Sequence, residues 1–324
     1  MSKEVSRKFS FFMLIFIFIV VLFHSDFRYF YPFIEDLTAV STAYFFCASA
    51  FFFCRGLSGK NSVENLKKRC VTLLLPYFLW NLIYMILYFR TDNFTFSGVI
   101  KGFTVNPICA PTWYLLTLFI FFVFVSLTKR MFCKTYLTVA VFLAGVLISY
   151  LGYIRFQQEL ATIPVVGGYL IRMAEYFTPF LIGAVVGTWF EEKIYVGWKN
   201  CVVGGISSVA ILVLLLWGMP TEVRWFLWVL LPLTLWEAIP EKIFTNAGLL
   251  QVLTEPAFFI NMVHCCLLVM WKAVMGSTGF VTGKHLAAVN VILTLAVSYG
   301  LYYLLRLLMP GTIKVLTGNR SGND

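Results

Sequence analysis

Charged residues are scarce in this sequence. Only 12% of its 324 residues are Asp, Glu, Lys or Arg, whereas 60% are hydrophobic; soluble domains carry about a quarter charged residues. A water-soluble fold could not bury so much apolar surface. The apolar residues form runs of about 20, the length that a helix needs to cross a bilayer. The sequence therefore predicts an all-α, polytopic membrane protein that forms a single domain over residues 1–324.

Several functional motifs are also absent. The eight cysteines include no CxxC pair, so neither a metal site nor a disulfide framework is indicated. The chain has no Walker GK[ST] and no GxGxxG, which argues against an ATP-driven machine. No internal repeat is visible, which disfavours a transporter built of two similar halves. We expect no bound metal and no resident cofactor.

The hydropathy pattern predicts about ten spans. If the N-terminus is cytoplasmic, Lys and Arg are about twice as frequent in the inner segments as in the outer ones, so both termini are predicted to be cytoplasmic. The net charge of +10 is then a topology signal, and no nucleic-acid partner is implied. The spans are residues 9–27, 37–54, 71–89, 112–128, 135–153, 170–190, 200–218, 223–239, 256–275 and 286–309.

Two ionisable residues, His24 and Asp26, follow the first uncharged run in "VVLFHSDF" (residues 20–27). His24 comes 17 residues after Arg7, which is about 25 Å of helix and nearly the hydrocarbon thickness. Both are therefore expected near the outer surface. At this level His24 is either a structural polar residue that ends the helix or a catalytic residue.

Other polar residues are predicted at the same level. Trp113 and Tyr114 open the fourth span, and Arg172 and Glu175 lie one turn apart near the start of the sixth. They form either an aromatic belt and an i,i+3 ion pair or part of a binding site. His264 lies deeper, in the ninth span, and is either functional or engaged in an interhelical hydrogen bond.

A basic cluster lies in the inner loop before the third span. It would bind anionic lipid headgroups or the phosphates of a cytosolic ligand near a helix N-terminus. Its residues are Arg55, Lys67, Lys68 and Arg69.

The order of landmarks along the chain resembles that of the acyltransferase 3 family of integral membrane acyltransferases. The resemblance extends over about residues 9–305. It rests on "VVLFHSD", "FFFCRGLSGK", "KKRCVTLLLPYFLW", "TWYLLTLFIFF", "EYFTPFLIGAVVG" and "EPAFFINMVHCCLL".

The resemblance implies transfer of an acyl group, often acetyl from acetyl-CoA, to sugar hydroxyls of bacterial surface polysaccharides, in the plasma (inner) membrane. It implies that His24 is catalytic and that Arg69, before Pro76, handles the CoA end. The family usually has arginine where this chain has Met13 and Thr72.

Chemistry then assigns roles to the remaining candidates. His24 would be general base or acyl carrier, oriented by Asp26 or Glu175. The basic cluster would bind the donor, and Trp113, Tyr114, Arg172 and His264 would line the acceptor site. The expected partners are an acyl-CoA, a sugar or polysaccharide acceptor and membrane lipids. The alternatives are a glycan or solute transporter or flippase, and a non-catalytic partner in polysaccharide assembly.

Overall fold

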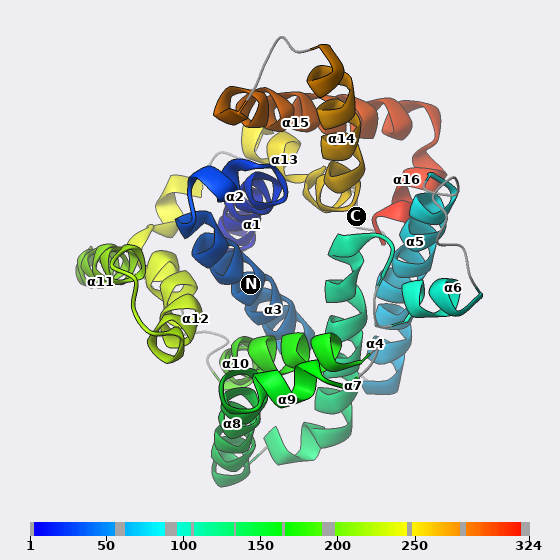
Figure 1. Cartoon of the computed structure of the whole chain (residues 1–324). Helices are drawn as coiled ribbons and strands as arrows, with labels where there is room; N and C mark the ends of the chain where they lie inside the picture. The colour runs from blue at the N-terminus through cyan, green and yellow to red at the C-terminus, as the bar shows by residue number, and fades with distance from the viewer. Residues whose placement is uncertain are drawn as a thin grey trace. The chain divides into compact units, whose positions relative to one another are not determined.

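The computed structural model describes most of the chain, and its described residues form helices without any strand (Figure 1). The described residues are 3–55, 62–87, 96–104, 107–132, 134–163, 166–189, 198–244, 248–278 and 283–318. Residues 56–61 of the predicted inner loop lie outside them. The chain divides into two compact units, and each is described by itself. Unit 1 comprises Met1–Val5, Ala39–Arg69 and Thr117–Thr245; unit 2 comprises Ser6–Thr38, Cys70–Leu116 and Asn246–Asp324.

Ten longer helical segments follow the predicted spans closely. They are α1 (Lys3–His24), α3 (Phe33–Arg55), α4 with the π-turn η1 and α5 (Ser62–Arg69, Cys70–Leu74, Leu75–Leu87), α7 (Trp113–Phe132), α8 with the π-turn η3 (Thr135–Ser149, Tyr150–Arg155), α10 (Gly167–Trp189), α11 (Trp198–Leu216), α12 (Thr221–Ala238), α14 (Ala257–Thr278) and α15 (Gly283–Leu308). The shorter elements are α2 (Phe27–Phe30), α6 (Phe96–Gly102), η2 (Ala110–Thr112), α9 (Gln157–Ala161), η4 (Glu241–Phe244), α13 (Gly248–Thr254) and α16 (Pro310–Leu316).

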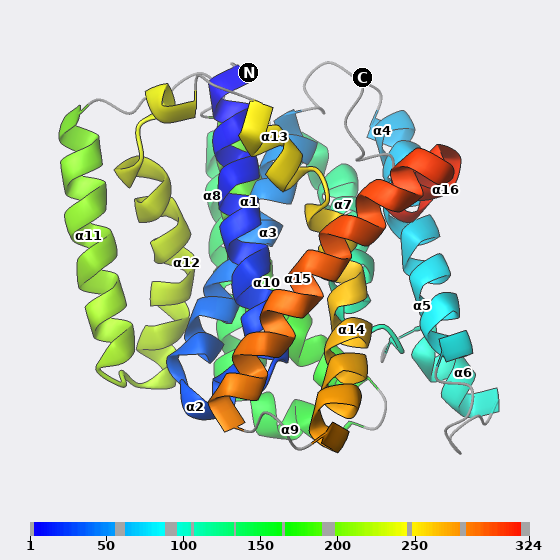
Figure 2. The same ribbon diagram turned by 90° about the horizontal axis from the view of Figure 1, so that it is seen from above.

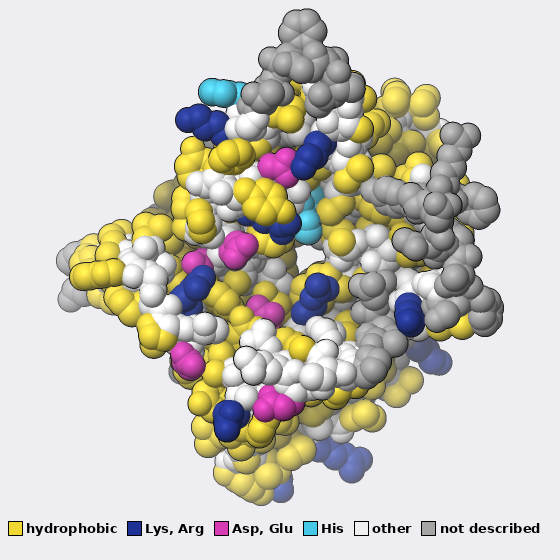
Figure 3. Space-filling view, in the orientation of Figure 1, with side chains coloured by type: hydrophobic (Ala, Val, Ile, Leu, Met, Phe, Trp, Pro, Cys, Tyr) yellow, Lys and Arg dark blue, Asp and Glu magenta, His cyan; other side chains and the backbone are white. Residues whose placement is uncertain are grey.

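Eight helical segments within the described residues are long and apolar enough to cross a membrane. The all-helical, polytopic prediction is thereby confirmed. The remaining two predicted spans coincide with α11, a shorter apolar helix, and α12, which carries three charged residues, Glu222, Arg224 and Glu237. On the face shown in Figure 3, basic and acidic side chains lie among the hydrophobic ones. The side of the membrane on which each terminus lies stays a prediction.

Close backbone contact joins α3 and α10 in unit 1. Gly183 and Gly187 of α10, one turn apart, lie against the backbone of α3 at Cys47 and Phe51; a Cβ on Gly183 would lie 2.0 Å from the Cys47 carbonyl oxygen. Helices in lipid gain little from hydrophobic burial, and small residues four apart let two backbones approach and pack. Near this contact Phe46 stacks on Tyr176 with ring centroids 5.4 Å apart.

We expect Gly183→Ala to destabilise the protein by about 1–3 kcal/mol, because the added methyl group meets backbone that cannot rotate away. Thermal unfolding in detergent would measure the loss. Gly205→Ala in α11 is the matched control, since a Cβ there meets nothing within 4 Å and alanine favours a helix. Equal unfolding temperatures for the two variants would contradict the close approach.

In unit 2, the segment after α15 packs back onto α5. The indole N–H of Trp80 donates to the carbonyl of Leu316 at 3.0 Å, and α16 packs against α5. Gly318 has φ +63°, and a Cβ there would lie 2.2 Å from the carbonyl oxygen of Thr72. Only glycine fits this position. The segment that follows the last span therefore packs against the π-turn η1.

Candidate functional site

His24 is the last residue of α1, and the local sequence ends the helix there. The hydroxyl of Ser25 donates back to the Leu22 carbonyl, and the same oxygen accepts the backbone N–H of Phe27 at 3.3 Å. Serine competes with the helical hydrogen-bond ladder in this way and so favours a turn. Val21, one turn earlier, is fully buried, whereas His24 is exposed. The turn thus leaves an exposed imidazole at the end of a helix that is buried on one side.

His264 lies on α14 of the same unit and is completely buried. Its Nδ1 is 3.1 Å from the Ile260 carbonyl oxygen. Because a carbonyl can only accept, we assign the proton of neutral His264 to Nδ1, which leaves a lone pair on Nε2. The Cys265 Sγ is 3.3 Å from that Nε2. Both of these polar contacts of His264 lie within its own helix rather than between helices.

The structure brings the two histidines together. The rings of His24 and His264 have centroids 5.0 Å apart and are tilted by 54°, and Phe23 packs edge-on against His24 at 5.1 Å. An exposed imidazole thus stands against a buried neutral imidazole whose Nε2, which the Cys265 thiol also contacts, carries the lone pair. This arrangement, the histidine pair, can fix which nitrogen of His24 carries hydrogen.

The histidine pair and Cys265 also form a group that could hold a metal ion among the described residues. Their ligand atoms lie within 4.8 Å of one another, whereas two ligands of one tetrahedral zinc lie about 3.5 Å apart. The carbonyl contact at His264 Nδ1 is the kind of outer partner that metal-binding histidines have. The expectation of no metal stays a prediction.

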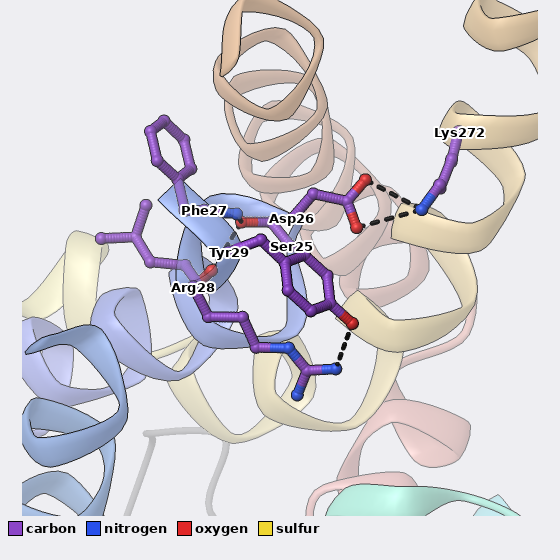
Figure 4. A network of polar contacts seen from close by, with 7 residues as sticks. Ser25, Asp26, Phe27, Arg28, Tyr29 and Lys272 are labelled. Carbon is purple, nitrogen blue, oxygen red and sulfur yellow. Dashed lines mark hydrogen bonds and ion pairs between the residues drawn. The ribbon is translucent and has the colours of Figure 1, made fainter. Parts of the chain in front are cut away.

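Asp26 pairs with a lysine in the structure (Figure 4). Its two carboxylate oxygens lie 3.0 and 2.8 Å from the Lys272 ammonium on α14, and both side chains are partly exposed. Such an exposed pair contributes about 0–1 kcal/mol. Beside it the Arg28 guanidinium donates to the Tyr29 hydroxyl at 2.9 Å. The helix that carries His264 therefore also holds the turn after His24, and the Asp26 carboxylate faces a lysine.

Trp113 and Tyr114 begin α7 in unit 2, directly after η2, and are half-buried. Asn81 braces this start: its amide donates to the Thr112 hydroxyl at 2.9 Å, and its Oδ1 accepts the Cys109 N–H at 3.0 Å. Burial raises the pKa of the Cys109 thiol well above its usual value, which favours the protonated thiol over the nucleophilic thiolate.

The other predicted site residues belong to unit 1. Arg172 is exposed on α10, and Glu175 is half-buried, with its carbonyl accepting the Trp225 indole N–H at 3.1 Å. The basic cluster lies at the ends of two helices. Arg55 closes α3; Lys67 and Lys68 are exposed and Arg69 is half-buried in the last turn of α4. The roles of all six stay predictions.

The two positions where the family usually has arginine are also described. Met13 is a half-buried residue of α1, and Thr72 is buried in the π-turn η1 with its hydroxyl unpartnered among the described residues. Neither residue supplies a positive charge.

A family model described as an acyltransferase domain matches residues 14–304. The chain belongs to the acyltransferase 3 family. No curated protein and no solved structure matches it. The match to acyltransferase 3 covers nearly the whole chain and includes both members of the histidine pair. The protein is thus a multi-pass membrane protein of an acyltransferase family.

Proposed function

We propose that the protein is a membrane O-acyltransferase that moves an acetyl group from acetyl-CoA, or another acyl group from its CoA thioester, to a hydroxyl of a cell-surface glycan or lipid-linked sugar. The bacterial inner membrane is the proposed location. Family membership supports acyl transfer. The histidine pair is the observation that carries the mechanism, because it sets an exposed imidazole against a buried one whose Nδ1 faces a carbonyl.

In the proposed reaction His24 is the general base. The acceptor hydroxyl gives its proton to the free nitrogen of His24 as its oxygen attacks the thioester carbonyl carbon. The C–O bond forms, the C–S bond breaks, and the departing thiolate takes up a proton. A positioned base of this kind contributes about 10²–10⁴ in rate. His264 Nε2 would accept the other N–H of His24 in place of the Cys265 thiol, which lies 3.3 Å from it, and so keep the attacking nitrogen free.

The direct test is transfer of labelled acetyl from acetyl-CoA by the purified protein in lipid nanodiscs, with and without a surface polysaccharide acceptor. Label should appear in an ester on the acceptor. Label retained on the protein when no acceptor is present would identify His24 as an acyl carrier rather than a general base. Absence of both transfer and thioester cleavage would favour a transporter or a non-catalytic partner.

The donor site proposed for the basic cluster gives a second test. Arg69→Ala should raise the concentration of acyl-CoA needed for half-maximal rate about ten- to a hundred-fold, since a hydrogen bond to a charged group contributes about 1.5–3 kcal/mol. The response to acceptor concentration should stay unchanged. Steady-state kinetics with varied donor would measure both.

Arg130→Ala is the control for this test, because it removes an exposed cation from the last turn of α7. It should leave the donor response as in the wild type. If Arg69→Ala behaves like Arg130→Ala, the cluster binds lipid headgroups instead.

A further inference from the structure

A row of buried polar side chains follows one face of α15 in unit 2. Asn290, Thr294 and Ser298 are spaced four residues apart and are each at most 4% exposed. Their Oδ1, Oγ1 and Oγ atoms have no hydrogen-bond partner among the described residues. Four residues bring a helix back to nearly the same face. The three residues therefore lie along the same buried side of a membrane-spanning helix.

Two further residues of α15 continue this row. The hydroxyl of Tyr302, which is fully buried, donates to Glu255 Oε1 at 3.1 Å, and Arg306 pairs with Glu255 Oε2 at 2.6 Å. We call the five side chains the polar track. From Asn290 to Arg306 it runs about 24 Å along the helix, most of the hydrocarbon thickness.

The missing hydrogen bonds are unusual for hydroxyls in helices. A buried threonine or serine normally donates to the carbonyl one turn earlier, as Ser208 does to Gly204 and Thr317 to Ile313, each at 2.7 Å. Thr294 and Ser298 make no such bond. In a membrane interior an unpaired polar group is costly, and water is the common partner where protein supplies none.

The polar track passes the level of the histidine pair. α14 and α15 pack against each other (Figure 2), and the contact of Phe259 with Tyr302 at 5.8 Å fixes their register. His264 lies five residues beyond Phe259 on α14, and Ser298 lies four residues before Tyr302 on antiparallel α15. His264 is therefore about 7.5 Å along α14 from that contact and Ser298 about 6 Å along α15, on helices that cross obliquely in Figure 2.

We propose that the polar track holds a chain of water molecules that links the level of the histidine pair to Glu255 and serves as a proton path. Hydroxyls suit this role because each can donate and accept at once. The proton path rests on the proposed function; the hydration does not. A proton taken by His24 from the acceptor would leave by hops, each breaking one O–H bond and forming another, and the released thiolate would take up one proton from solvent.

Hydration is tested first, by hydroxyl-radical labelling of the wild-type protein during X-ray radiolysis of water. Tyr302 and Tyr84 are a matched pair, both tyrosines of unit 2 and both at most 1% exposed. The Tyr84 hydroxyl is satisfied by protein, since it donates to the Met262 carbonyl at 2.8 Å and accepts the Cys266 N–H at 3.0 Å. We expect Tyr302 to be modified at least about ten-fold faster, because it would lie beside ordered water.

Removing two hydroxyls should dry the track. In Thr294→Val combined with Ser298→Ala, labelling of Tyr302 should fall to the rate of Tyr84, while Thr294→Ser, which keeps the hydroxyl, should label as the wild type does. Equal labelling of Tyr302 and Tyr84 in the wild type would overturn the proposal. So would an increase in unfolding temperature in the double variant, because a dry track gains stability when unpaired hydroxyls are removed.

The proton path is tested by turnover. In the double variant, kcat for acyl transfer should fall about ten-fold or more, with unchanged KM for the donor. The single variant Thr294→Ser, which keeps the hydroxyl, should have the wild-type kcat. If the double variant loses Tyr302 labelling but keeps the wild-type kcat, the track is hydrated but is not a proton path. If the wild type transfers no acyl group, the proposed function fails, and the labelling result still decides whether the track is hydrated.

Discussion

His24→Gln is expected to lower acyl transfer by at least about a hundred-fold while protein level and membrane insertion stay normal. Glutamine keeps the polarity and hydrogen bonding of the side chain but cannot take a proton, so only the general-base contribution of about 10²–10⁴ is lost. His24 is exposed at the end of α1, and losing a polar helix end would cost at most about 1–2 kcal/mol of stability. Transfer of labelled acetyl, normalised to inserted protein, measures the effect.

The chain supplies a matched control for His24→Gln. It has three histidines, and the third, His285, is exposed near the start of α15. His285→Gln should transfer acetyl at the wild-type rate. Near-normal transfer by His24→Gln would mean that His24 is structural, and the transporter and assembly-partner alternatives would then be preferred.

His264→Leu is expected to lower kcat about 10- to 100-fold with little change in KM for donor or acceptor. The reason is positional: His264 Nε2 is the acceptor that would fix the tautomer of His24. Loss of the partner that orients a metal-bound histidine, a similar role, costs about 10–100-fold. Leucine fills the buried site without a polar atom. Steady-state kinetics on detergent-purified protein of confirmed unfolding temperature would separate kcat from KM.

His264→Gln distinguishes a positioning role from a packing role, because its amide oxygen can still accept a hydrogen bond. It should recover much of the rate that leucine loses. Equal activity of the leucine variant and the wild type would remove His264 from the mechanism. If the histidine pair and Cys265 instead held zinc, a chelator would abolish transfer by the wild type and added zinc would restore it.

The helical membrane fold was predictable because its cause is local. In lipid, a run of about 20 apolar residues can satisfy its backbone hydrogen bonds only as a helix. Each predicted span overlaps one of the ten longer helical segments. The two segments that are not among the eight long, apolar ones pack against each other as a hairpin (Figure 1): α11 is a shorter apolar helix, and α12 carries three charged residues. The close packing at Gly183 and Gly187 is also visible in the sequence, since glycines four residues apart in an apolar helix are typical of closely packed helices.

The composition of the site was less predictable. From the sequence, His264 was predicted to lie deeper in the membrane than His24. That prediction came from the number of residues between each histidine and the end of its span, which assumes that every helix is perpendicular to the membrane. Their contact at 5.0 Å depends on how far α1 and α14 tilt and shift along each other, which is set by packing and not by span length. For the same reason Lys272, the partner of Asp26, carried no signal in the sequence.

The fastening of Gly318 to η1 has a consequence for biogenesis. Residues 310–318 are synthesised after every helix long enough to span, yet they supply the carbonyl that accepts the Trp80 indole N–H and cover the carbonyl of Thr72. α5 therefore enters the bilayer long before its polar groups are satisfied. Until translation passes residue 318, the nascent chain leaves this surface of α5 and η1 uncovered. A membrane quality-control protease or chaperone can recognise the uncovered surface.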